Sequence, residues 1–209
     1  ALNILTSSPN ANIGALLTSD PRVDVVSFTG STTTGSRVME NAAKTIKKTL
    51  LELGGKSAMI VLDDADFEQA LPAAAFVCSN AGQGCILNTR LLVPRTRYEE
   101  AITILKDIYS NIPFGNQSHM KKIMGPIISE KKKKNVLSYI EKGKAEGARL
   151  VVGGGIPKDF TKGYFIEPAL FGDVDNKMTI AQEEIFGPVL VVSPFEDDED
   201  AIRIANDSI

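Results

Sequence analysis

Residues 23–56 read VDVVSFTGSTTTGSRVMENAAKTIKKTLLELGGK. The β-branched run Val23 to Phe28 predicts a short strand. The segment after the following turn predicts a helix, because apolar residues recur there at helical spacing, namely Val38, Met39, Ala42, Ala43 and Ile46. Thr33 or Thr34 can cap this helix, and Thr49 to Leu53 predicts a second strand. The order of strand, helix and strand indicates a parallel pair, because parallel neighbours need a crossover connection.

Strands and helices alternate along the rest of the chain as well. Further strands are predicted at residues 57–62, 89–93 and 149–152, and helices at residues 13–18, 98–111 and 129–146. An alanine-rich helix is predicted to follow Asp66 and to run to about Asn80, with a kink at Pro72. The pattern therefore predicts an α/β fold with substantial parallel pairing.

The composition is that of an ordinary soluble globular protein, with 43% hydrophobic and 23% charged residues and a formal net charge of -3. Nothing in it suggests nucleic acid, and the Lys131 to Lys134 run is interpreted as a solvated helix face. No apolar run reaches membrane-spanning length, and no signal-peptide pattern opens the chain. Two cysteines are too few for a disulfide framework, so we expect a reducing compartment and a cytoplasmic protein.

The turn at residues 28–35, FTGSTTTG, follows a predicted strand and opens a predicted helix. This arrangement can bind phosphate through free backbone N–H groups and the helix dipole. The turn is not a P-loop, because Ser36-Arg37 follows its second glycine where Lys and then Ser or Thr would be needed. It also lacks the dinucleotide-binding glycine spacing. On spacing alone, a structural turn and a pyrophosphate contact both remain open.

Two glycine-rich strings carry reactive side chains: residues 52–56 read ELGGK and residues 80–85 read NAGQGC. They supply a carboxylate and a thiol, the groups that form and hydrolyse a thioester. Free cysteines are mostly buried, but Cys85 follows a predicted helix on flexible polar backbone, where a core residue would gain little. Glu52 ends an apolar strand and is either desolvated, and so suited to proton transfer near neutrality, or turned to water.

Three other groups are weaker candidates. Cys78 lies inside the alanine-rich helix and should be inert, although both cysteines could share a helix face. His119, the only histidine, lies in a polar loop, so solvent exposure is the expectation. Ile86 and Leu87 beside the thiol indicate an apolar wall. No metal site is predicted.

Four motifs give the chain a resemblance to a known family. Residues 28–35, 52–56, 80–85 and 183–189 (EEIFGPV) resemble, in the same order, motifs of the NAD(P)-dependent aldehyde dehydrogenases. Residues 125–129 (GPIIS) and 163–168 (GYFIEP) add support. The resemblance covers nearly the whole chain and implies open, mainly parallel sheets with helices on both faces, incomplete at both ends.

The resemblance also implies chemical roles for two residues. Cys85 aligns with the nucleophile that forms a thiohemiacetal and then a thioester. Glu52 aligns with the general base that activates water against this thioester. A carboxylate at position 52 favours hydrolysis over the coenzyme-A-acylating branch of the family. The implied reaction is the oxidation of a small-molecule aldehyde to a carboxylic acid with NAD or NADP.

Other positions match residues that bind the cofactor in the family. Gly30 and Ser31 match the pyrophosphate-binding turn, which favours the functional interpretation of that segment. Leu53 and Gly54 match backbone that lines the nicotinamide pocket. Glu184 matches the residue that holds the nicotinamide ribose, and Phe186 matches the aromatic residue beside the ring.

The resemblance implies two domains. Residues 1–54 resemble part of a Rossmann-like cofactor-binding domain, and residues 55–209 resemble a catalytic α/β domain that is incomplete at its C-terminus. Family members are longer, and the asparagine that completes their oxyanion hole lies upstream, so the isolated chain is expected to be inactive. The full-length protein is expected to be a homo-oligomer, a dimer or a tetramer.

An alternative is a catalytically inactive aldehyde dehydrogenase-like fragment that acts as a nucleotide- or subunit-binding module. The presence of both Cys85 and Glu52 favours the enzyme, because such a module has no physical need for a thiol on a flexible loop.

Overall fold

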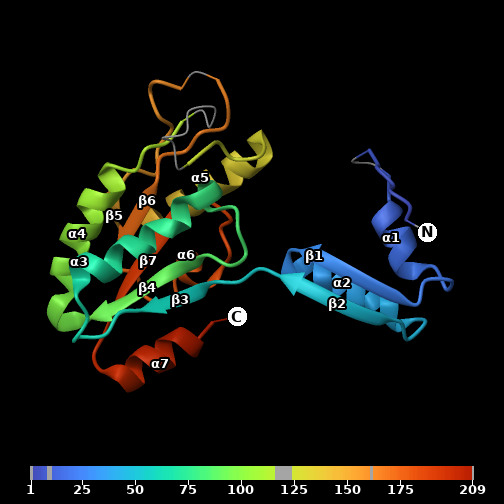
Figure 1. Ribbon diagram of the computed structural model, residues 1–209, viewed down its shortest axis with the longest axis horizontal. Helices are drawn as coiled ribbons and strands as arrows, with labels where there is room; N and C mark the ends of the chain where they lie inside the picture. Colours follow the sequence, from blue (N-terminus) through green and yellow to red (C-terminus); the bar gives the residue numbers. More distant parts are fainter. Residues whose placement is uncertain (1, 9–10, 116–123, 161, 209) are drawn as a thin grey trace. The chain divides into compact units, whose positions relative to one another are not determined.

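The computed structural model describes residues 2–8, 11–115, 124–160 and 162–208. The chain divides into two compact units, Ala1–Gly54 and Gly55–Ile209. Figure 1 labels their elements. Within the described residues, no helix combines the length and the apolar character needed to cross a membrane.

The first unit contains a parallel two-stranded sheet and two helices. Its elements are α1 (Ile13–Ser19), β1 (Val25–Gly30), α2 (Thr32–Ala43) and β2 (Lys48–Leu53). The predicted strand, helix and strand are thus confirmed, with β1 beginning two residues later than expected. The cap of α2 is a correction: the Ser31 side chain, not Thr33 or Thr34, accepts the helix N–H, from Thr34.

Helix α2 covers one face of this small sheet. Side chains along β2 alternate between exposed and half-buried, as the pleat of a strand requires. On the half-buried face, the Leu53 side chain packs under Gly35 of α2. The opposite face includes Leu50, which is 62% exposed.

The second unit is built on a five-stranded sheet of order β3-β4-β7-β6-β5. The strands are β3 (Ser57–Ile60), β4 (Asn88–Pro94), β5 (Arg149–Val152), β6 (Ala169–Gly172) and β7 (Val189–Phe195). Only the β5–β6 pair is antiparallel, so the prediction of mainly parallel sheets is confirmed. Strands β6 and β7 were not among the predicted strands; β6 is buried throughout and so lacks the alternation that marks a half-buried strand.

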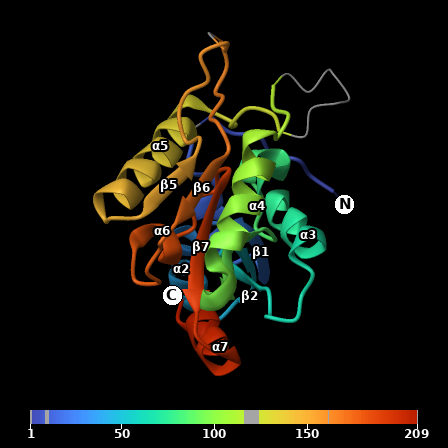
Figure 2. The same ribbon diagram turned by 90° about the vertical axis from the view of Figure 1, so that its left-hand side faces the viewer.

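Helices cover both faces of this sheet, as predicted. Figure 2 shows α4 (Tyr98–Ser110) and α5 (Glu130–Ala145) on opposite sides of it. Consecutive residues of β6 explain this arrangement. Phe171 packs toward Gly143 of α5, whereas Gly172 meets Tyr98 and Ile102 of α4. The short helix α6 (Thr179–Gln182) packs against α5.

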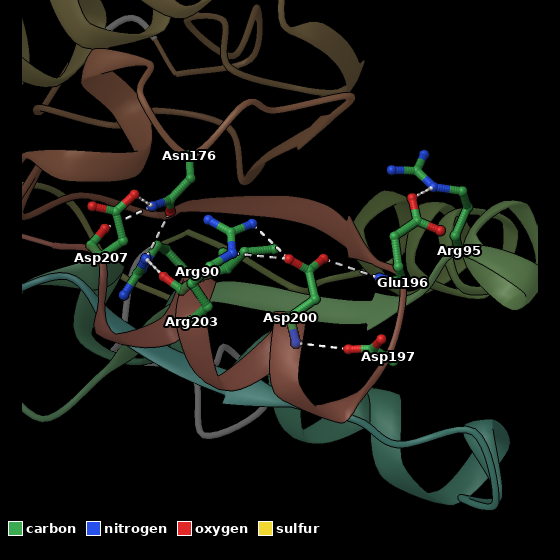
Figure 3. A network of polar contacts seen from close by, with 9 residues as sticks. Arg90, Arg95, Asn176, Glu196, Asp197, Asp200, Arg203 and Asp207 are labelled. Carbon is green, nitrogen blue, oxygen red and sulfur yellow. Dashed lines mark hydrogen bonds and ion pairs between the residues drawn. The ribbon is translucent and has the colours of Figure 1, made fainter.

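A buried arginine attaches the last helix, α7 (Asp198–Asn206), to the sheet. The Arg90 guanidinium donates hydrogen bonds to the Lys56 carbonyl (2.8 Å), to Asn176 Oδ1 (2.8 Å) and to the Ala205 carbonyl (2.7 Å). Figure 3 shows Arg90 and Asn176 in this network beside Asp207. The side chain therefore satisfies carbonyl groups at the C-terminal end of α7, which that helix leaves without partners.

The alanine-rich segment is not one kinked α-helix. A single α-helical turn, α3 (Phe67–Ala70), leads into the 3-10 helix η1 (Leu71–Gly82), with Pro72 in its first turn. Proline has no N–H to donate, so it is tolerated at the start of a helical segment rather than inside one. Helical backbone ends before Ser79, so Cys78 and Cys85 do not share a helix face.

Candidate active site

The thiol of Cys85 lies on a tightly turned loop. Asn80 (φ 50°), Ala81 (φ 55°) and Gly82 (φ 74°) all have left-handed backbone, which is unfavourable for the first two because they carry a Cβ. Cys85 follows three residues later and is exposed. A run of left-handed residues at a candidate site indicates a loop held in one conformation by its surroundings.

The two cysteines differ as the sequence predicts. Cys78 is fully buried, and this burial raises the pKa of its thiol to about 12. The buried thiol therefore stays protonated near neutral pH. Of the two residues expected to form an apolar wall beside the thiol, Ile86 is 78% exposed, whereas Leu87 packs into the core. The wall itself stays a prediction.

The Gln83 side chain ties the thiol loop together. Its amide donates to the Asn80 carbonyl (3.0 Å) and to the Pro126 carbonyl (3.4 Å), while its Oε1 accepts the Ile128 N–H (2.8 Å). The Asn80 amide donates in return to the Gln83 carbonyl (3.0 Å). These contacts join the loop to the segment that leads into α5.

A second backbone contact joins the thiol loop to the loop of Glu184 and Phe186. A Cβ built on Gly82 would lie 1.9 Å from the Gly187 carbonyl oxygen, so the two backbones touch. Gly187 in turn packs against Val136 of α5. The fold thus brings the predicted nucleophile segment and the predicted ribose-binding segment together.

Within that second loop, Phe186 also has left-handed backbone (φ 57°). Glu184 is half-buried, and burial raises the pKa of its carboxyl, an effect opposed by the Gly55 N–H and by the positive charges of Lys132 and Lys56. The adjacent Glu183 accepts a hydrogen bond from the Tyr139 hydroxyl (2.5 Å). The loop is therefore anchored to α5.

Lys56 is a notable residue that sequence reasoning did not assign. Its side chain is buried, and within the described chain its ammonium has no hydrogen-bond acceptor. Burial, together with the charge of Arg90, lowers its pKa to about 7, against the opposite effect of Glu184. The available signal was its place directly after the two glycines of the 52–56 motif.

The first unit brings together the other predicted residues at the carboxyl ends of β1 and β2. In the parallel register, Thr29 lies opposite Glu52 and Gly30 lies opposite Leu53. The carboxyl ends of parallel strands are the edge at which α/β folds bind ligands. The glycine turn and the start of the 52–56 motif are therefore neighbours.

The turn has the form of an anion site. Ser31 caps α2 and accepts the Thr34 N–H at 3.3 Å. Residues 31–34 are exposed, so the remaining N–H groups of the first helical turn face solvent. These donors suit a pyrophosphate. The turn itself, residues 28–35, contains no lysine that could clamp a phosphate.

Glu52 is exposed, so the hypothesis of a desolvated carboxylate is wrong for this unit and the water-facing alternative holds. The physical reason is the pleat of β2. Glu52 shares its face with the exposed Leu50, whereas α2 covers the face of Leu53.

Several remaining predictions can be placed. Lys131, Lys132 and Lys134 are exposed on α5, as a solvated helix face requires. His119 lies outside the described residues.

Among the side chains that the structure describes, no three His, Cys, Asp or Glu form a group that could hold a metal ion. A hollow of about 660 Å³ beside α7 is lined by Asn176, Arg203 and Asp207, among others, and not by the predicted site residues.

Comparison with known proteins gives the family. Residues 1–209 match the aldehyde dehydrogenase family. A Staphylococcus saprophyticus protein described as "Putative aldehyde dehydrogenase" is 48% identical over 206 residues, which are 98% of this chain and 43% of that protein. A Staphylococcus epidermidis protein of the same description is 47% identical over the same coverage. The chain therefore spans less than half the length of these relatives.

Solved structures share the fold. Mycobacterium tuberculosis aldehyde dehydrogenase complexed with NAD+ has a TM-score of 0.93 and 50% identity, over 95% of this chain and 41% of that one. A cysteine-to-alanine mutant of Pseudomonas syringae aldehyde dehydrogenase C, with NAD+ and octanal, has a TM-score of 0.92 and 38% identity, over 94% and 41%. Staphylococcus aureus betaine aldehyde dehydrogenase with NAD+ has a TM-score of 0.91 and 41% identity, over 94% and 40%.

Sheet order, helix placement and these superpositions define the chain as part of an open α/β protein of the aldehyde dehydrogenase fold. The chain belongs to the aldehyde dehydrogenase family.

Proposed function

We propose that the protein carrying this chain oxidises an aldehyde to a carboxylic acid with NAD or NADP, through Cys85 and Glu52. One observation carries the proposal furthest. The exposed Cys85 lies on a loop whose Gly82 touches Gly187, in the loop of Glu184 and Phe186. A nucleophile and a candidate cofactor-binding carboxylate thus belong to two loops in backbone contact.

Cys85 acts as the nucleophile. Its thiolate attacks the carbonyl carbon of the aldehyde, forming a C–S bond and a tetrahedral oxyanion. The Cys85 backbone N–H donates a hydrogen bond to this oxyanion, a type of contact that strengthens as the charge develops. Loss of hydride from the same carbon restores the carbonyl and leaves a thioester on Cys85.

Cofactor binding is assigned to residues of both units. In the first unit, Gly30 and Ser31 present the helix α2 N–H groups to the pyrophosphate, and Leu53 and Gly54 line the nicotinamide pocket with backbone. In the second, Glu184 accepts hydrogen bonds from ribose hydroxyls. The exposed capped turn and the half-buried carboxylate fit these tasks.

Phe186 lies beside the nicotinamide ring in this proposal. When bound, NAD(P)+ supplies the hydride acceptor. The names of the solved neighbours report NAD+ complexes, which supports NAD(P) as the cofactor.

Glu52 acts as the general base. It takes a proton from water, whose oxygen attacks the thioester carbon, and the C–S bond breaks to release the carboxylic acid and the Cys85 thiolate. Overall, one aldehyde, one water and one NAD(P)+ give one carboxylate, one NAD(P)H and two protons. The domain roles follow: residues 1–54 contribute to cofactor binding, and residues 55–209 carry the nucleophile.

The full-length polypeptide tests this proposal with a panel of aldehydes and both cofactors, followed at the absorbance of the reduced nicotinamide. We expect Cys85→Ser to abolish turnover, whereas Cys78→Ala, its matched control, keeps it. We expect Glu52→Gln to release one rapid equivalent of NAD(P)H and then to turn over slowly, because acylation outruns hydrolysis. Glu40→Gln, an exposed glutamate of α2, is its control.

Full steady-state activity in Glu52→Gln would remove the base assignment, and full activity in Cys85→Ser would remove the nucleophile. An inactive full-length protein that still binds NAD(P)H would favour the nucleotide-binding module instead. The homo-oligomeric state stays a prediction, which sedimentation velocity of the same sample measures.

A further inference from the structure

The loop that carries Cys85 needs an external restraint. Asn80 and Ala81 hold consecutive left-handed conformations, each of which costs a residue with a Cβ roughly 1 kcal/mol. Such backbone persists only where surrounding contacts over-determine it. The contacts that do this are therefore part of how the thiol is placed.

Gln83 supplies most of these restraints. Its side chain and its own N–H both donate to the Asn80 carbonyl, at 3.0 and 3.1 Å, and so close the left-handed turn. The reciprocal Asn80 bond to the Gln83 carbonyl closes it from the other side.

The same amide group also reaches outside the loop. It donates to the Pro126 carbonyl and accepts the Ile128 N–H, 43 and 45 residues away in sequence. Both the donor and the acceptor of the Gln83 amide are thus used. The segment it reaches precedes Ser129, the cap of α5, and α5 packs against Gly187 through Val136.

We propose that Gln83 is a positioning residue for Cys85: its amide fixes the left-handed turn and ties it to residues 126–128, which sets where the thiol and the Cys85 N–H lie. Its catalytic consequence rests on the proposed dehydrogenase function. Its structural consequence does not.

The test compares three variants of the full-length protein. Gln83→Met removes every side-chain hydrogen bond at similar volume. Gln83→Glu keeps an acceptor for the Ile128 N–H but loses both donors and adds a charge. Ser193→Ala is the control: it removes another buried hydrogen bond of the same unit, from the Ser193 hydroxyl to the Val174 carbonyl (2.6 Å), far in sequence from the loop.

We expect Gln83→Met to speed hydrogen exchange of the amides of residues 79–87 and to lower kcat about ten- to a hundredfold, while KM for the cofactor stays within about threefold. Ser193→Ala should lower the melting temperature by a similar amount, but it should change neither the hydrogen exchange of residues 79–87 nor kcat. In Gln83→Glu, the added carboxylate should move the pH profile of Cys85 alkylation by iodoacetamide to higher pH, a change that a purely structural loss does not produce.

Unchanged exchange of the loop in Gln83→Met would overturn the inference, as would a kcat loss no larger than that of Ser193→Ala. If Gln83→Met does not fold, Gln83→Glu carries the same exchange and alkylation criteria. If the parent oxidises no aldehyde, the proposed function fails, and loop exchange with Cys85 alkylation still decides the role of Gln83.

Discussion

The carbonyl oxygen of Gly187 occupies the space that a side chain at Gly82 would fill, 1.9 Å from an ideal Cβ. Gly82 also has φ +74°, which L side chains rarely adopt. Two independent reasons therefore require glycine here. Between them, these two residues set the separation of the Cys85 loop and the Glu184 loop.

Gly82→Ala should be severely destabilising. We expect a loss of about 2 to 4 kcal/mol in the free energy of unfolding, because backbone must move to relieve the overlap. The matched control is Gly147→Ala, which shares a positive φ (98°) but has open space around its Cβ. Chemical denaturation of both variants measures the difference. Equal losses would show that φ alone, and not the contact with Gly187, accounts for the effect.

Native thiol labelling should separate the two cysteines. At pH 8 we expect iodoacetamide to modify Cys85 and to leave Cys78 unmodified until denaturant is added, because burial raises the Cys78 pKa to about 12 and blocks access. Peptide mass spectrometry of the native and unfolded protein gives both yields. Labelling of both thiols at one rate in the native protein would contradict the buried position of Cys78.

Lys56 should make stability depend on pH. Its pKa is about 7 in the folded state and about 10.5 when solvated, so between these values the unfolded chain binds a proton that the folded chain has released. The free energy of unfolding should therefore rise with pH, by at most about 1.4 kcal/mol per unit. The useful window is pH 7 to 9. Above pH 9.0, the ordinary pKa of a cysteine thiol, the raised pKa of Cys78 makes stability fall with pH instead.

Lys56→Met should remove this slope and raise stability near pH 7, because an apolar side chain has no charge to desolvate. Lys106→Met, at an exposed position of α4, is the control and should leave the slope intact. Urea denaturation at several pH values measures it. An unchanged slope in Lys56→Met would assign the effect to another group.

Arg90→Met should loosen α7. The substitution leaves the Lys56 and Ala205 carbonyls without their donor, and we expect a cost of about 2 to 4 kcal/mol. Arg203→Met is the control, since its guanidinium is mostly exposed and pairs with the nearby Asp200; it should cost less than about 1 kcal/mol. Hydrogen exchange along α7 locates the change. Unaltered exchange of α7 in Arg90→Met would show that the helix is held by its apolar side chains alone.

Local sequence was sufficient for much of the fold. The β-branched run before Gly30, the helical spacing after it and the alternation of elements predict β1, α2 and the parallel pairing, because sterics and hydrophobic periodicity act between residues close in sequence. The glycines around Cys85 likewise predicted a loop, but the expectation of flexible backbone missed its left-handed turn, which hydrogen bonds close. Residues 66–80 were less tractable, since Pro72 permits both a kink and a new helical start.

Contacts that exist only in the folded chain decide which residues of the candidate site are buried and which segments meet. Glu52 and Lys56 belong to one short motif, yet one is exposed and the other is buried, because burial depends on which element covers each face of a sheet. The hydrogen bonds of Gln83 to Pro126 and Ile128, and the meeting of Gly82 with Gly187, join segments far apart in the sequence. No pattern within a single segment encodes such contacts, since each exists only once the other segment is in place.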